Sequence, residues 1–301
     1  MTQLRRLRLA GPLLAVALAF TTACASVRIP AARAPDGPAM WVVRDEDSTI
    51  YLFGTVHVMR AEAAWRTPRI AAALAASDEL VLEITEVDNP AAMLPAIQRH
   101  GLDLTRRLST KLTLDENQRL DRAARSMGMD VQAFEPMRPW MVSLQLVIGA
   151  LTRAGYDPEA GVDRILKSEA LAAGKRVTAL ETVDQQLGFF GSLPPEVELR
   201  LLRESLDDFD KSAEAFDPLA DGWLRGDLKA LERYMVRDWK REAPDLYRVL
   251  IVDRNRNWAG QLEAKLKGSG TSFVAIGAGH LVGPDSVQAQ LRARGIASTR
   301  H

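Results

Sequence analysis

The sequence predicts an α/β protein with a central mixed or parallel β-sheet and large helical insertions. Short runs of β-branched, aromatic and apolar residues alternate with helical patterns, which is typical of a sheet flanked by helices. Two of the helical stretches, residues 91–154 and 183–268, are too long to be simple strand connections. Hydrophobic residues make up 47% of the chain, which is enough to form a real core.

Five segments have the composition of strands. The first two, residues 40–44 and 48–53, are separated by a polar turn and predict a hairpin. The others are residues 79–85, 176–180 and 271–276. Besides the two long stretches, helices are predicted in residues 68–76, from residue 161 onward and in residues 285–294, before a short final strand.

The N-terminus has the pattern of a bacterial export signal. Residues 1–25 begin with Arg5, Arg6 and Arg8 and continue into an apolar run over residues 9–20, which is too short for an ordinary membrane span. Residues 26–39 hold three prolines and a glycine and predict a flexible linker. The folded domain is expected over residues 40–299.

Cys24 leaves two interpretations of this signal open. Ala23-Cys24-Ala25 fits an ordinary signal-peptidase site, whereas Thr22-Ala23-Cys24 resembles the end of a lipoprotein box. Thr21 stands where such a box usually has Leu, but the only cysteine of the chain lies at this point, which favours lipidation of Cys24. An uncleaved anchor is a third, less favoured interpretation. The first two interpretations predict an exported protein, either periplasmic or lipid-anchored in the cell envelope.

Composition excludes several classes of protein. A single cysteine excludes an internal disulfide framework and a zinc site of the CxxC type. The 39 basic and 39 acidic residues form no basic stripe interleaved with aromatic residues, so nucleic acid is not an expected partner. Membrane contact is expected only through a lipid on Cys24. The sequence does not indicate an oligomeric state.

Two of the four histidines follow strands in the same pattern. The strands predicted at residues 48–53 and 271–276 both lead into Gly-x-x-His, which contains His57 and His280 respectively. Ligand sites in open α/β sheets lie beyond the carboxyl ends of strands. We therefore expect His57 and His280 to share a site, with glycines allowing sharp turns and close approach there.

Glu83, near the end of a third strand, completes the candidate site. Two imidazoles and one carboxylate can hold a divalent metal, here Mn, Co, Fe or Zn, and leave positions open for water. Without a metal, Glu83 or one histidine could act as a general base. Each residue also has an ordinary structural interpretation, because a single Gly-x-x-His is a weak signal and a strand-end glutamate is more often in a salt bridge.

Other polar and aromatic residues are interpreted structurally. His100 is expected to be a solvated helix cap, and His301, at the terminus, to be disordered. Glu181 is expected to cap a helix or support the site. The four tryptophans of the domain that lie in apolar patterns are expected in the core, namely Trp41, Trp140, Trp223 and Trp258.

Several spaced motifs resemble those of the TraB/GumN family, which belongs to the TIKI-like superfamily and is distantly related to erythromycin esterases. Residues 51–57 (YLFGTVH) resemble its opening motif, and residues 277–283 (GAGHLVG) its closing motif. Glu83 lies where the family has an acidic strand. The intervening blocks are residues 161–163, 174–186, Trp223 with 226–227, and the RNRNW of residues 254–258. Together they span essentially the whole mature chain.

This resemblance implies an α/β core and a hydrolase. TIKI proteins are metal-dependent proteases that use the two Gly-x-x-His histidines, and the esterase relatives use a histidine and a glutamate. Carried over, this implies His57, Glu83 and His280 as catalytic residues and metal ligands, with Arg254 and Asn255 as secondary catalytic candidates. Arg254 has two interpretations, an oxyanion-stabilising cation or an ion pair beneath the sheet.

Three functions follow as expectations. The first is a metal-dependent peptidase or esterase acting on a peptide or small-molecule substrate. The second is a non-catalytic envelope protein that binds a metal, haem or small ligand through the same histidines. The third is an accessory role in surface-polysaccharide processing, which the low aromatic content of 6% does not favour.

Overall fold

The computed structural model describes residues 37–86 and 89–301. Most of the predicted signal and linker therefore lies outside the described residues, although Pro38 and Ala39, at the linker's end, are already buried. No helix in the described part is long and apolar enough to cross a membrane.

A six-stranded mixed sheet forms the core, in the order β4-β3-β5-β2-β1-β6. The four strands from β4 to β2 are parallel, and β1 runs antiparallel to both β2 and β6. The strands are β1 (Met40–Arg44), β2 (Ser48–Thr55), β3 (Glu79–Leu82), β4 (Arg176–Ala179), β5 (Gly270–Gly277) and β6 (Ser298–Arg300). The predicted α/β class and the hairpin of β1 and β2 are confirmed.

Helices cover both faces of the sheet and one of its ends. They are α1 (Pro68–Ala76), α2 (Pro90–His100), α3 (Leu114–Ser126), α4 (Pro139–Arg153), α5 (Val162–Ala172), α6 (Val183–Gly191), α7 (Pro195–Asp207), α8 (Ser212–Leu224), α9 (Leu228–Glu232), α10 (Asp238–Glu242), α11 (Pro244–Tyr247), α12 (Arg254–Leu266) and α13 (Val287–Arg292). Two π-helical segments, η6 (Arg233–Arg237) and η7 (Arg248–Asp253), lie between α9 and α12.

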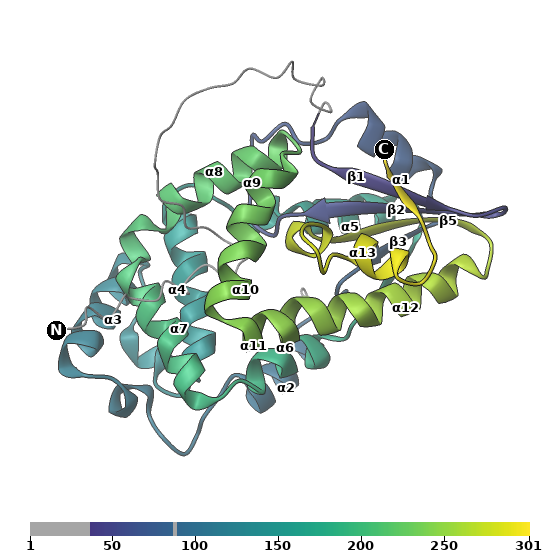
Figure 1. Ribbon diagram of the computed structural model, residues 1–301. Coiled ribbons are helices and arrows are strands. Elements are labelled where there is room, and N and C mark those ends of the chain that lie inside the picture. Colours follow the sequence, from purple (N-terminus) through teal and green to yellow (C-terminus); the bar gives the residue numbers. More distant parts are fainter. Residues whose placement is uncertain (1–36, 87–88) are drawn as a thin grey trace, which may run out of the picture.

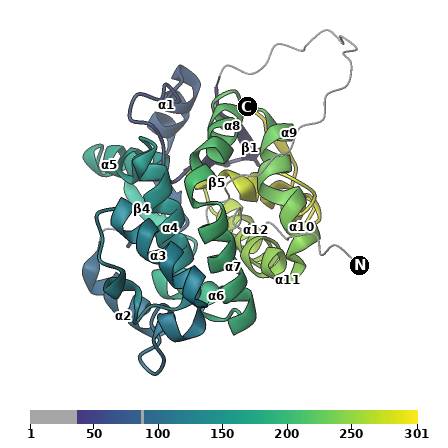
Figure 2. The ribbon, with the colours of Figure 1, turned by 90° about the vertical axis from the view of Figure 1, so that its left-hand side faces the viewer.

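The alternation of side chains along the strands divides the core into two layers. Tyr51 and Phe53 of β2 face one layer, whereas Ile50 and Leu52 face the other, which is completed by Trp258 and other residues of α12 and α13. A third cluster lies among α3, α4 and α7. These helices belong to a lobe that lies beyond the carboxyl ends of the parallel strands (Figure 1), and Figure 2 shows α2–α4 on one side of this lobe and α9–α11 on the other.

Local chemistry explains where several elements begin. Thr67 caps α1 ahead of Pro68, and Thr182 forms a capping box with Gln185 at the start of α6. β3 ends at Leu82, three residues before the predicted end, and Glu83 then turns its carboxylate toward β5. The sequence therefore predicts the order of elements well, and the strand ends near the site less well.

Glu79, the first residue of β3, stabilises the end of the sheet opposite to Glu83. Its carboxylate accepts hydrogen bonds from Lys265, Ser272 (2.6 Å) and Arg176 (3.1 Å), and its side chain is only 4% exposed. Burial alone would raise the pKa of Glu79, but these donors outweigh it and hold the pKa below its ordinary value of 4.5. Glu79 therefore contributes stability that is fully present above pH 4.5 and is lost as the pH falls through the lowered pKa.

Replacing Glu79 with Gln should lower the free energy of unfolding at pH 7 by about 2 kcal/mol, because charge-assisted hydrogen bonds are lost. The gap between variant and wild type should narrow progressively below pH 4.5. Urea unfolding at pH 7, 4 and 3 measures this difference in the free energy of unfolding. Glu263→Gln, at a half-buried position, is the control and should cost under about 1 kcal/mol. A gap that stays constant with pH would contradict this assignment.

Candidate functional site

His57 leaves the end of β2 and is anchored on both sides. Trp223 donates its indole N–H to the carbonyl of Gly54 (2.7 Å), and the N–H of Val162 donates to the carbonyl of Val56 (3.0 Å). This places His57 beside the first turn of α5, where its Nδ1 lies 3.0 Å from a carboxylate oxygen of Asp163. With Nδ1–H donating to Asp163, the other ring nitrogen, Nε2, points toward β5.

The Asp163 carboxylate controls the charge of His57. Loss of hydration disfavours the protonated ring, but the charge and hydrogen bond of Asp163 outweigh it and raise the pKa of His57 to about 9. The His57 side chain is 48% exposed, so it can exchange protons with solvent. At neutral pH the ring is predominantly protonated and can donate a proton from Nε2.

His280 follows β5 within the 3₁₀ turn η8 (Ala278–Leu281), and it is buried. Asn255 donates its amide N–H to the carbonyls of Asp285 (2.8 Å) and His280 (3.4 Å), which fixes its oxygen 2.6 Å from Nδ1 of His280. We therefore assign the proton of His280 to Nδ1, which leaves Nε2 as an acceptor 3.2 Å from Arg254. Burial and the Arg254 cation lower the pKa of His280 to about 3, so the ring is neutral.

Glu83 joins three elements through its carboxylate. One oxygen accepts from the backbone N–H of Gly277 (2.6 Å), and the other from Gln186 (3.0 Å) and Arg254 (2.7 Å). Burial alone would raise the pKa of Glu83, but the Arg254 guanidinium holds it well below its usual range. Glu83 is therefore a fixed anion.

Arg254 is a buried structural cation in this arrangement. Its guanidinium bonds both oxygens of Glu181, Glu83, His280 and the carbonyl of Leu250, so each of its five N–H groups has a partner. Of its two predicted interpretations, the geometry corresponds to the ion pair. Glu181 also accepts from the indole of Trp258 (3.0 Å), so the expected supporting role of Glu181 fits its position.

Gly277 lies where His57 comes close to the buried residues Glu83 and His280. A Cβ placed there would lie 3.0 Å from a Glu83 oxygen and 3.6 Å from both Nε2 of His57 and Cδ2 of His280. Its φ of −51° is ordinary, so glycine is needed here for close approach and not, as the sequence suggested, for a sharp turn. Because Gly277 has no side chain, His57 can face Glu83 and His280 directly.

A cavity of about 320 Å³ lies against His57 and Glu83. Asp163, Arg164, Gln186 and Thr55 form its polar lining. Its apolar lining consists of Leu82, Ile84, Ile148, Pro158 and Ala275. Such a mainly apolar cavity with a few polar groups is typical of a small-molecule site.

The structure brings the five predicted site residues together but divides them by position. His57 and Glu83 line the cavity, whereas Arg254 hydrogen-bonds Glu83, and His280 and Asn255 follow in a chain of hydrogen bonds from Arg254. Sequence reasoning missed Asp163 and Gln186 as site residues. Both lie in motifs that carried the family resemblance, and the acidic residue in Gly161-Val162-Asp163 was the available signal.

The two remaining histidines differ from their predictions. His100 is half-buried, not a solvated cap, because its Nε2 bonds Asp184 (3.0 Å) on α6. The terminal His301 is ordered, since its backbone N–H donates to the carbonyl of Met40 and its ring lies 5.5 Å from that of Tyr51.

The donor set does not fit a divalent metal as it is arranged. Among residues 37–86 and 89–301, no group of three or more His, Cys, Asp and Glu side chains could hold an ion. The contacts give the reason, because the Arg254 guanidinium already hydrogen-bonds both Nε2 of His280 and the Glu83 carboxylate. A divalent cation at that point would be repelled by Arg254.

The fold and the site define a class of α/β protein in which a helical lobe covers a buried His–Glu–Arg cluster at parallel strand ends. The chain belongs to the TraB/PrgY/gumN family, whose model matches residues 39–300, and the predicted membership is thereby confirmed. The chain is also 22% identical to an uncharacterized protein of Treponema pallidum (strain Nichols), across 92% of this chain and 88% of that protein. No solved structure was found to match it.

Proposed function

We propose that this protein is an exported hydrolase that cleaves a peptide or ester bond in the cavity beside His57. One observation carries the proposal. Nε2 of His57 and the Glu83 carboxylate both lie close to Gly277, which has no side chain to separate them, and both residues line that cavity. A proton donor and a fixed anion that face the same point can act on one bound group.

The residues divide into those that touch substrate and those that position them. In the proposed reaction, water adds to the acyl carbon and loses a proton to solvent, the bond to the leaving group breaks, and His57 protonates the leaving group and is then reprotonated from solvent, to which it is exposed. In this proposal the hydrogen bond of His57 to Asp163 fixes the orientation of the ring for that transfer. Glu83 orients the water in this proposal, while His280, Arg254 and Asn255 act as positioning residues.

The opposed charge states of the two histidines support this division. An environment that separates the pKa values of two groups commonly gives them different roles. Here Asp163 favours the protonated form of His57, whereas burial beside Arg254 keeps His280 neutral.

Metal dependence remains a prediction from the family resemblance, and no step above uses an ion. Metal analysis of the purified mature protein decides it. A metal site would be supported by stoichiometric Mn, Co, Fe or Zn in the wild type and none in a folded His57→Ala/His280→Ala variant. Because both proteins retain Arg254, that result would mean that Arg254 moves aside when the ion binds.

Replacing His57 with Ala should lower turnover about a hundredfold while the fold is retained, since a positioned proton donor is lost. The assay is a panel of p-nitrophenyl esters and fluorogenic peptides, followed at constant pH. His100→Ala is the matched control, because His100 also pairs with an aspartate but lies outside the cavity. Full activity in His57→Ala would overturn the proposal, and binding without turnover in the wild type would favour the non-catalytic alternative.

The export part of the proposal is carried by residues 1–25 alone, which lie outside the described residues. Intact mass of the protein recovered from membrane and soluble envelope fractions distinguishes lipidated Cys24 from ordinary cleavage. A full-length chain in the cytoplasm would overturn export.

A further inference from the structure

Thr55, the last residue of β2, has a buried hydroxyl without a partner. The residue is 1% exposed, and its Oγ1 has no hydrogen-bond partner among the described residues. A buried polar atom left unpaired costs free energy, so such an atom in a native protein calls for an explanation. The hydroxyl is therefore a candidate contact for a bound molecule.

The sheet directs Thr55 toward the site. In the parallel pairing of β2 with β5, Thr55 is opposite Gly277, and paired residues in a sheet present their side chains on the same face. That face of Gly277 is the one surrounded by His57 and Glu83. Thr55 also lines the cavity itself.

The position of Thr55 is rigid. The carbonyl before it, that of Gly54, accepts from Trp223, and the carbonyl after it, that of Val56, accepts from Val162. A side chain held in this way needs little reorganisation to bind a ligand, which is what a preorganised donor requires.

The rest of the cavity indicates what kind of molecule reaches Thr55. Apart from its polar groups, the cavity is lined by aliphatic side chains and a proline, namely Leu82, Ile84, Ile148, Pro158 and Ala275. Arg164 at the cavity is already paired with Glu159 (2.9 Å). The lining thus suits an uncharged aliphatic group better than a charged one.

We infer that Thr55 binds the carbonyl oxygen of a substrate whose small aliphatic acyl group fills this cavity. This inference rests on the proposed function and names its substrate class, an ester or amide of a short aliphatic acid. The Thr55 hydroxyl donates to the oxygen and forms no covalent bond. Because negative charge grows on that oxygen during hydrolysis, the hydrogen bond should strengthen in the transition state.

The test compares Thr55→Val with Thr55→Ser and Thr49→Val. Valine has the shape of threonine without the hydroxyl, and serine restores the hydroxyl. Thr49 lies on the same strand and the same sheet face, at the end away from the site, and serves as the matched control. Two readouts are used, binding of N-acetyl-leucinamide by NMR titration and turnover of p-nitrophenyl isobutyrate.

Thr55→Val should weaken binding of N-acetyl-leucinamide about fivefold, as for one lost hydrogen bond, and lower kcat about a hundredfold. Thr55→Ser should recover most of both, and Thr49→Val should match the wild type. Thr55→Val should also be at least as stable as the wild type on heating, because it removes an unpaired buried hydroxyl. A structural role for Thr55 would instead lower the thermal midpoint.

The outcomes separate this inference from the proposed function. If Thr55→Val weakens binding but the wild type turns over neither esters nor peptides, the acyl cavity stands and the hydrolase fails. If His57→Ala abolishes turnover while Thr55→Val changes neither readout, the hydrolase stands and the inference is overturned. A wild type that neither binds the probe nor hydrolyses the ester overturns the assignment of an aliphatic acyl cavity.

Discussion

Replacing Arg254 with Met is expected to lower the free energy of unfolding by about 3–5 kcal/mol, because it leaves two buried carboxylates without their cation. The side chains of Glu83 and Glu181 are 9% and 1% exposed, and both hydrogen-bond Arg254. Without the guanidinium, we expect the pKa of Glu83 to rise, since burial alone raises it. Guanidinium unfolding at pH 7 measures the loss of stability.

The matched control for Arg254 lies two residues further along α12. Arg256 is 62% exposed and pairs with Asp253, so Arg256→Met should cost under about 1 kcal/mol. Arg254→Lys should be intermediate, because an ammonium cannot reproduce the fork that bonds both glutamates. Adding Glu181→Gln to Arg254→Met should restore part of the stability. An Arg254→Met protein as stable as Arg256→Met would show that the cluster is not the buried ion pair described.

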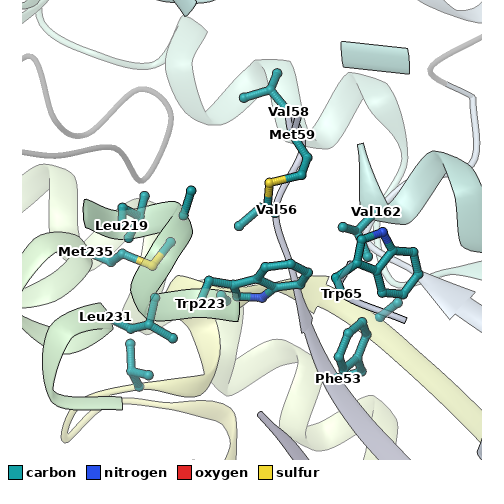
Figure 3. Packing of buried hydrophobic residues seen from close by; sticks show 14 of the residues in the cluster. Phe53, Val56, Val58, Met59, Trp65, Val162, Leu219, Trp223, Leu231 and Met235 are labelled. Carbon is teal, nitrogen blue, oxygen red and sulfur yellow. The ribbon is translucent and has the colours of Figure 1, made fainter. Parts of the chain in front are cut away.

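Trp223→Ala is expected to cost about 3–5 kcal/mol, as other fully buried aromatic truncations do. Trp223 is 1% exposed, and its ring packs against Phe53 (6.3 Å between centroids) and Trp65 (6.4 Å). Figure 3 shows it beside these residues at the end of β2. Truncation also removes the donor to the Gly54 carbonyl, three residues before His57.

A pair of milder variants separates stability from the positioning of His57. Trp140 is as deeply buried as Trp223, but it stacks on Phe190 and donates to the carbonyl of His100. Trp223→Phe and Trp140→Phe should both reduce stability, whereas only Trp223→Phe should shift the imidazole NMR signals of His57. Equal shifts in the two variants would mean that the indole bond to Gly54 does not fix His57.

The sequence was sufficient for the parts of the fold that depend on local pattern. Runs of β-branched, aromatic and apolar residues predicted β1 and β2, and Pro68 marked the start of α1. The repeated Gly-x-x-His after β2 and β5 predicted that His57 and His280 would meet, since parallel neighbouring strands end at the same edge of a sheet. All of these signals lie within a few residues of the feature they predict.

The partners of each site residue were decided only by tertiary structure. Asp163 is 106 residues from His57, and Arg254 is 171 residues from Glu83, and no local pattern encodes such pairings. The same histidine motif consequently has opposite protonation at its two positions, because Asp163 stabilises the charged ring of His57 while Arg254 and burial oppose it in His280. The residue types and the order of the elements were thus determined by the sequence alone, whereas the charge and the access of the site residues depended on which distant side chains the fold placed beside them.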